Sequence, residues 1–228
     1  MTADIARPSL AIDMADFRRL VAVALLSGLV AGILLSLWQH YQLQPLILAA
    51  ERFEASGGEA GHDWRPANGF ERNAFTLLFN GLSGFGFSLL ICAAMYWQEN
   101  SGYLRGLLWG IAGYAVFFAA PSLGLPPELP GTDSAALRDR QIWWLFTASA
   151  TALGLALLFL GKNRYLQLAG ALLLPAPHLL GAPHPEIYRS AAPMELQRHF
   201  VWLSAVSNAL FWLTLGLLSG WLAPKVKL

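Results

Sequence analysis

Two histidines and a glutamate lie close together in one proline-rich stretch of this sequence. The stretch runs from Leu172 to Glu186 and places His178 six residues before His184, with Glu186 shortly after them. Imidazole nitrogens and a carboxylate suit borderline divalent ions such as cobalt, nickel or zinc. We therefore predict a transient metal site here. The alternative is that both histidines are interfacial residues that hydrogen-bond to lipid headgroups or to the backbone.

Further candidate ligands are the carboxylate of Glu128 and the imidazoles of His40 and His199. Glu128 belongs to a second proline-rich stretch, Pro121 to Gly131, which can also be interpreted as a rigid loop. We expect Glu186 or Glu128 to join His178 and His184 at one membrane interface. No permanently bound cofactor is expected, because a transported ion must be able to leave its site.

The composition indicates an integral membrane protein. Of 228 residues, 56% are hydrophobic and 13% are charged, whereas a soluble domain carries roughly 25% charged residues. The net charge of +1 argues against a nucleic-acid partner. The single cysteine, Cys92, excludes an internal disulfide and a thiolate metal cluster.

Six apolar runs follow one another, and each approaches the ~17–25 residues that a spanning helix needs. We predict an all-α polytopic bundle over residues 17–224, preceded by a tail at 1–16, with a loop at 41–72 that contains a short helix. The predicted spans are about 18–38, 74–97, 104–121, 141–161, 165–181 and 200–222. The fifth run is interrupted by Pro175 and Pro177, so five full spans plus one broken span is the alternative count.

The basic residues predict the orientation. The segments that six spans place with the termini carry eight lysines and arginines against four acids, and the opposite segments carry seven against ten. The positive-inside rule puts both termini in the cytoplasm. All five histidines then fall on or near the outer side.

Glycines in the spans predict close helix packing. The pairs Gly28 and Gly32, Gly106 and Gly110, and Gly216 and Gly220 each have the G-x-x-x-G spacing that lets helix backbones approach. We expect these pairs to pack within the chain, and a homo-oligomer stays open as the alternative.

The sequence resembles the CbtA family of proposed cobalt transporter subunits. The similarity runs from Phe17 to Trp221 and rests on the following motifs: F-R-R-L-V-A-V-A-L-L-S-G-L-V-A-G from Phe17, Q-x-x-x-x-x-P-L-I-L-A-A-E from Gln39 to Glu51, L-G-L-P-P-E-L-P-G from Leu123 to Gly131, and P-H-L-L-G-A-P-H-P from Pro177 to Pro185. The resemblance implies a bacterial inner-membrane protein that takes up cobalt for cobalamin synthesis. It also implies a small partner, CbtB, with one membrane span and a histidine-rich segment.

Several catalytic and energy-coupling motifs are absent from the sequence. There is no G-x-x-x-x-G-K-[ST], H-E-x-x-H or G-x-S-x-G motif, so neither ATP hydrolysis nor an intramembrane hydrolase is expected. No acid or base lies at the centre of a predicted span, where a proton-coupled carrier usually has one. We therefore expect a non-enzymatic metal permease subunit that depends on a partner. A scaffold of a membrane complex is the main alternative, followed by a membrane enzyme or an organic-solute transporter.

Overall fold

The computed structural model describes residues 13–56, 66–99 and 101–226, and within these ranges the chain is helical without strands. The elements in chain order are α1 (Met14–Gln42), α2 (Gln44–Ser56), α3 (Phe70–Trp97), α4 (Tyr103–Tyr114), the π-helical segment η1 (Ala115–Ala119), α5 (Ala120–Gly124), α6 (Leu137–Leu160), α7 (Arg164–Leu173), α8 (Ala176–Leu180), α9 (Met194–Leu222) and the 3-10 turn η2 (Ala223–Val226). This arrangement confirms the predicted all-α fold class, and α2 is the short helix predicted within the 41–72 loop.

Five helical segments in the described part of the chain are long and apolar enough to cross a membrane. They are Met14–Gln42, Phe70–Trp97, Tyr103–Gly124, Leu137–Leu160 and Met194–Lys225. The fifth predicted span is instead split into α7, of 10 residues, and α8, of 5 residues. Pro175 lies at the break and Pro177 lies within α8, and proline supplies no N–H to a helix and clashes with the preceding turn. Six continuous spans is therefore wrong, and the alternative of five full spans plus one broken span is correct.

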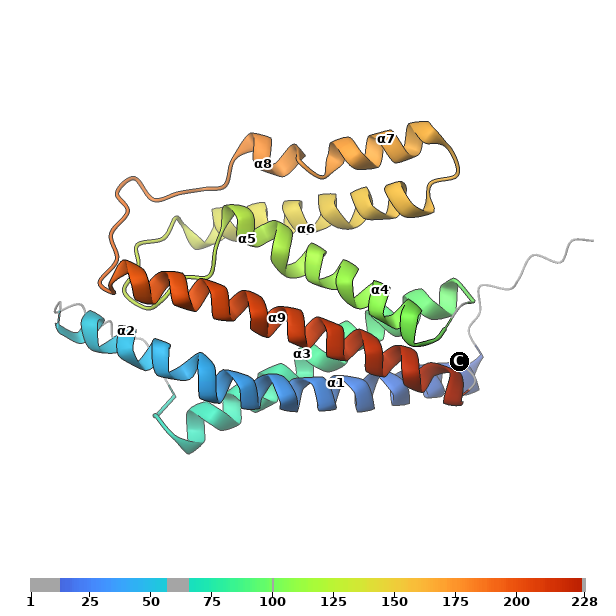
Figure 1. Ribbon diagram of the computed structural model, residues 1–228, viewed down its shortest axis with the longest axis horizontal. Coiled ribbons are helices and arrows are strands. Elements are labelled where there is room, and N and C mark those ends of the chain that lie inside the picture. Colours follow the sequence, from blue (N-terminus) through green and yellow to red (C-terminus); the bar gives the residue numbers. More distant parts are fainter. Residues whose placement is uncertain (1–12, 57–65, 100, 227–228) are drawn as a thin grey trace, which may run out of the picture.

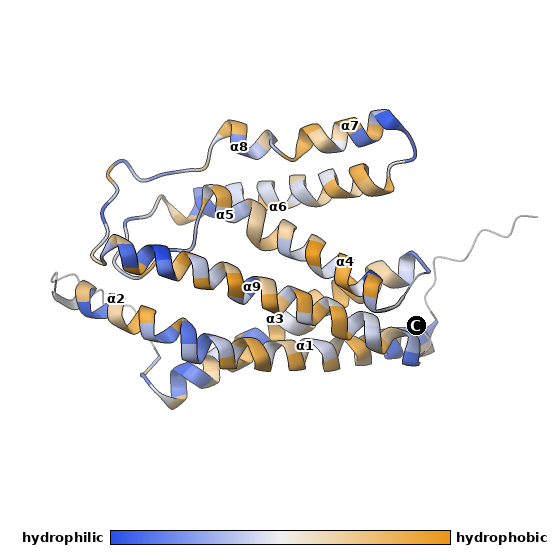
Figure 2. Ribbon diagram, viewed as in Figure 1, coloured by the Kyte–Doolittle hydropathy of each residue, from blue (hydrophilic) through white to orange (hydrophobic). Residues whose placement is uncertain are grey.

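The long helices run side by side with alternating direction, and the broken pair α7–α8 lies along α6 (Figure 1). The beginning of α1 and the turn η2 contact each other at one end of the bundle, which we call the terminal end. The opposite end, which we call the loop end, carries α2 and the connections 125–136 and 181–193 (Figure 1). Apolar residues cover much of the length of the helices, and hydrophilic residues gather toward both ends (Figure 2). This is the pattern expected of a bundle with its apolar belt in a bilayer.

Glycine contacts hold the tightest helix pairs together. A side-chain carbon on Gly28 would collide with the backbone of Gly84, so α1 and α3 touch through their main chains. In the same way, Gly106 of α4 lies against the backbone of Gly216 and Gly220 of α9. The prediction that the three G-x-x-x-G pairs pack within the chain is confirmed, since all three contribute to these two interfaces.

A small polar cluster joins three helices inside the apolar core. Ser27 of α1, Ser88 of α3 and Ser219 of α9 are fully buried, and their hydroxyl oxygens lie 2.7, 2.9 and 3.1 Å apart. Each hydroxyl has a partner in the cluster, so no unpaired polar group remains there. The cluster lies beside Cys92, which is fully buried.

Candidate functional site

The connections 125–136 and 181–193, in which the two proline-rich stretches end, meet at the loop end. A pair of backbone hydrogen bonds joins them, from the N–H of Asp133 to the carbonyl of Arg189 and from the N–H of Ala191 to the carbonyl of Gly131, each 2.9 Å long. The hydroxyls of Thr132 and Ser190 add a third contact at 3.2 Å. Stretches more than fifty residues apart in sequence therefore form one platform over the ends of the helices.

A glutamine of α9 fixes this platform to the bundle. The side chain of Gln197 donates to the carbonyl of Pro127 at 2.8 Å and accepts from the N–H of Leu129 at 3.1 Å. Leu129 is buried and packs with Leu43, at the junction of α1 and α2, and with apolar residues of α2 and α9 such as Ala50 and Phe200. The carbonyl of Pro127 and the N–H of Leu129 lie outside any helix, and Gln197 gives each of them a hydrogen-bond partner.

Glu128 has one partner in its own connection and one at the beginning of α6. Its carboxylate lies 3.2 Å from the guanidinium of Arg140 and accepts a hydrogen bond of 2.6 Å from the hydroxyl of Ser134. A metal at this carboxylate would have to compete with the arginine. A structural role for Glu128 is therefore visible, and its role as a ligand stays a prediction.

His178 lies in the broken crossing and is less exposed than the other candidate histidines of the described residues. It lies in α8, half-buried, and its ring packs edge-on against Trp143 of α6, with the ring centroids 5.8 Å apart. The backbone N–H of His178 donates to the carbonyl of Pro175 across the break. The break between α7 and α8 thus places the imidazole of His178 against α6.

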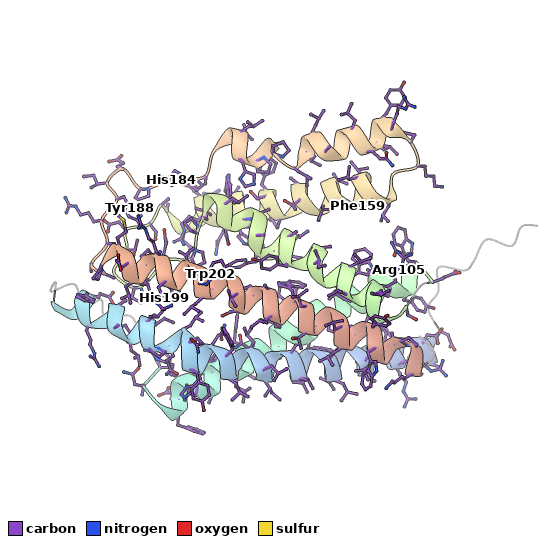
Figure 3. All side chains as sticks on the ribbon, in the orientation of Figure 1. Arg105, Phe159, His184, Tyr188, His199 and Trp202 are labelled. Carbon is purple, nitrogen blue, oxygen red and sulfur yellow. The ribbon has the colours of Figure 1, made fainter. Side chains whose placement is uncertain are left out.

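His184, Glu186 and His199 are exposed at the loop end. Figure 3 shows His184 and Tyr188 on the 181–193 connection and His199 and Trp202 on α9, with Arg105 at the opposite end. Across the described residues, no three side chains of histidine, cysteine, aspartate or glutamate come together to hold a metal. The predicted convergence of His178, His184 and a carboxylate is therefore not present as a ready-made site. The remaining histidine, His62, lies outside the described residues.

His40 lines a separate cavity among α1, α2, α3 and α9, whose wall combines polar groups with apolar side chains such as Leu77 and Phe200. Its Nδ1 lies 2.6 Å from the side-chain oxygen of Gln44 and 3.3 Å from that of Asn73. Both neighbours are amide oxygens, so the tautomer that fits them has its proton on Nδ1 and leaves Nε2 as an electron-pair donor. The cavity has a volume of about 720 Å³, and Gln39, Arg72 and Thr76 also line it.

Apart from His40, the polar residues in and beside this cavity were not among the predicted site residues. Asn80, which is buried on α3, donates to the hydroxyl of Ser36 at 3.0 Å and to the side-chain oxygen of Gln39 at 2.7 Å. Asn73 and Asn80 are seven residues apart, so they lie on one face of a helix. That spacing is a sequence signal for a polar stripe, but neutral amides have neither the charge nor the imidazole that marks a candidate metal ligand.

Comparison with known proteins gives one match. The family model described as "Probable cobalt transporter subunit (CbtA)" matches residues 17–224, nearly the whole chain. No curated protein matches, and no solved structure does either. The match includes both proline-rich stretches of the platform and every membrane-crossing helix of the described part, so this polytopic membrane protein belongs to the CbtA family of probable cobalt transporter subunits.

Proposed function

We propose that this chain is the membrane-spanning subunit of a cobalt uptake transporter in the bacterial inner membrane. The single observation that carries the proposal is the family match over residues 17–224. The helical architecture agrees with it, because five full crossings and one broken crossing provide a bundle in which an ion can be led between helices. Nickel and other divalent ions prefer similar ligands, so the test below includes them as competitors.

The broken crossing supplies the proposed route for the metal. Non-helical backbone at membrane depth is tolerated where it is buried in protein or lines a wet cavity. His178 lies at such a break and contacts α6. We assign the first contact with the incoming ion to His178 and His184, with Glu186 or Glu128 as the carboxylate. His40 and His199 are further imidazoles on the same face.

The absence of a preformed cluster in the described residues suits a transient site. A transported ion must bind well enough to exchange part of its water shell and weakly enough to leave again. Side chains on the 181–193 connection can approach the metal one after another as it exchanges ligands. A closed cage of four ligands would hold the ion instead.

A partner completes the proposed transporter. The family is one of subunits, and the chain has no nucleotide-binding motif of its own. We propose a small single-span partner with a histidine-rich segment, which raises the local concentration of the metal. The loop end then faces outward and both termini face the cytoplasm, in line with the positive-inside rule.

Uptake of radioactive cobalt in bacterial cells that lack other cobalt permeases tests the proposal. Cells that express the chain together with the histidine-rich partner should accumulate cobalt, and excess nickel should reduce the accumulation if the route is shared. Cells that express either protein alone should accumulate much less. Accumulation equal to that of empty-vector cells, with both proteins present in the membrane, would favour the scaffold alternative.

A further inference from the structure

Three buried polar groups without a partner lie in a row on α6. They are the indole N–H of Trp143 and the hydroxyls of Thr147 and Thr151, and within the described ranges none of them has a hydrogen-bond partner. Their exposed fractions are 7%, 0% and 4%. The spacing of four residues places them on one face of the helix, and a rise of 1.5 Å per residue spreads them over about 12 Å along the helix axis.

This face of α6 packs against the broken crossing, α7–α8. Beyond one end of the row, Gly154 lies against the carbonyl of Gly170 and the side chain of Leu174 in the α7–α8 segment. At the other end, Trp143 contacts His178 of α8. Thr147 and Thr151 lie between these two contacts. Their four-residue spacing from Trp143 puts them on the helix face that makes both contacts, so we place them at the seam between α6 and α7–α8.

The other side of the seam contains the break between α7 and α8. Pro175 and Pro177 supply no N–H, so the carbonyls of Ala171 and Leu173 lose the donors that a regular helix would give them. Carbonyl oxygens in such a break are available to water or to a cation. Hydroxyl and carbonyl oxygens thus lie on the two sides of the same short stretch.

Burying a hydroxyl without a partner is unfavourable, and buried polar groups in folded proteins are nearly always paired with protein or with ordered water. Valine has the same branched shape as threonine without the hydroxyl, so packing alone does not require threonine at two successive turns. By contrast, the buried hydroxyls of Ser27, Ser88 and Ser219 are all paired with one another. The α6 row therefore points to a partner that is not protein.

We infer that the seam between α6 and α7–α8 is a hydrated path for the cation. In it, the hydroxyls of Thr147 and Thr151 and the carbonyls freed at the break replace part of the water shell of an ion that arrives at His178. This inference rests on the proposed function and adds the route through the membrane. Neutral oxygen ligands bind a divalent ion weakly enough to let it move on, as conduction requires.

The first test exchanges the hydroxyls for methyl groups. The double variant Thr147→Val/Thr151→Val should lower cobalt uptake about tenfold or more, because the barrier rises when the replacement ligands are lost. Its thermal stability in detergent should stay equal or increase, since the buried unpaired hydroxyls are gone. Thr147→Ser/Thr151→Ser keeps the oxygens and should retain most of the uptake, and so should Ser149→Ala on the exposed face of α6. Wild-type uptake in the double valine variant would overturn the inference.

The second test asks whether the seam contains water, independently of cobalt. In the full chain with its partner, Thr151→Cys should react with a small hydrophilic methanethiosulfonate reagent, and mass spectrometry should locate the label at position 151. Cys92, which is fully buried beside the paired serines, serves as the internal dry control. A position 151 that stays as unreactive as Cys92 would overturn the inference. A failure of the proposed function would instead appear as absent cobalt uptake by the wild-type pair.

Discussion

The imidazoles at the loop end differ in how much the protein has already fixed them. His178 is half-buried against Trp143, whereas His184 and His199 are exposed, and His40 is bound to two side-chain amides. A fixed imidazole loses less freedom when it binds a metal, and an exposed one meets the hydrated ion first. These roles are different, and variants of single residues can separate them.

Replacement of His178 and His184 tests the ligands of the proposed metal route. The double variant His178→Ala/His184→Ala should reduce cobalt uptake about tenfold or more, because few ligands remain to exchange for water. Each single variant should lose less, and His62→Ala should resemble the wild type. The readout is cobalt accumulation at matched protein levels in the membrane. Full uptake by the double variant would remove both histidines from the route.

The hydrogen bonds of Gln197 should be structural. Gln197→Ala leaves the N–H of the buried Leu129 and the carbonyl of Pro127 without their partner. Such a loss costs about 1–3 kcal/mol, so the variant should unfold at a lower temperature in detergent. Arg198→Ala, at the neighbouring exposed position, is the matched control and should change little. Equal unfolding temperatures for the two variants would show that the platform does not depend on Gln197.

At the scale of the helices, the glycines of α3 give a sharp internal comparison. A side-chain carbon on Gly84 would meet the backbone of Gly28, whereas one on Gly86 would meet nothing within 4 Å. Gly84→Ala should therefore push α1 and α3 apart and destabilise the protein by about 1–3 kcal/mol, which is the usual cost of overpacking. Gly86→Ala should be neutral in the same thermal-unfolding assay. A neutral Gly84→Ala would contradict the close contact of α1 and α3.

The positions of the membrane crossings could be predicted from the sequence because apolar length is a local property. The predicted spans agree with the five long helices, which extend a few residues further, as with α1 at Met14–Gln42 and α9 at Met194–Leu222. The polar turns of a helix can continue into the headgroup region without any apolar signal. The prolines at 175 and 177 also indicated locally that the fifth crossing is broken.

The assembly of the candidate site could not be predicted in the same way. The pairing of Gly131 with Ala191, and the hydrogen bonds of Gln197 to the carbonyl of Pro127 and the N–H of Leu129, depend on contacts between distant parts of the chain. In the sequence, nothing distinguishes Thr147 and Thr151 from other helix residues. Only the packed structure shows that their hydroxyls are buried without a partner. Neutral polar residues carry little signal alone, because their meaning depends on whether a partner is within reach.

At the scale of the whole molecule, we propose one orientation in the membrane, with the loop end outside. Glu186 and Lys162 are exposed at opposite ends of the bundle and suit cysteine labelling. Glu186→Cys should react with a membrane-impermeant thiol reagent in intact cells, and Lys162→Cys only after permeabilisation. The buried Cys92 contributes little background. The reverse labelling pattern would overturn the orientation and, with it, the assignment of the loop end to cobalt capture.

The flow of cobalt across a membrane that contains only this chain and its partner tests the central claim most directly. Proteoliposomes with both proteins and an internal cobalt-quenched fluorophore would receive external cobalt, so that the imposed gradient supplies the driving force. Fluorescence should fall faster in these proteoliposomes than in protein-free vesicles. The Thr147→Val/Thr151→Val variant should abolish most of this difference in quenching rate. Quenching by the wild-type pair at the protein-free rate, with both proteins inserted, would contradict the claim that cobalt crosses the membrane through this protein.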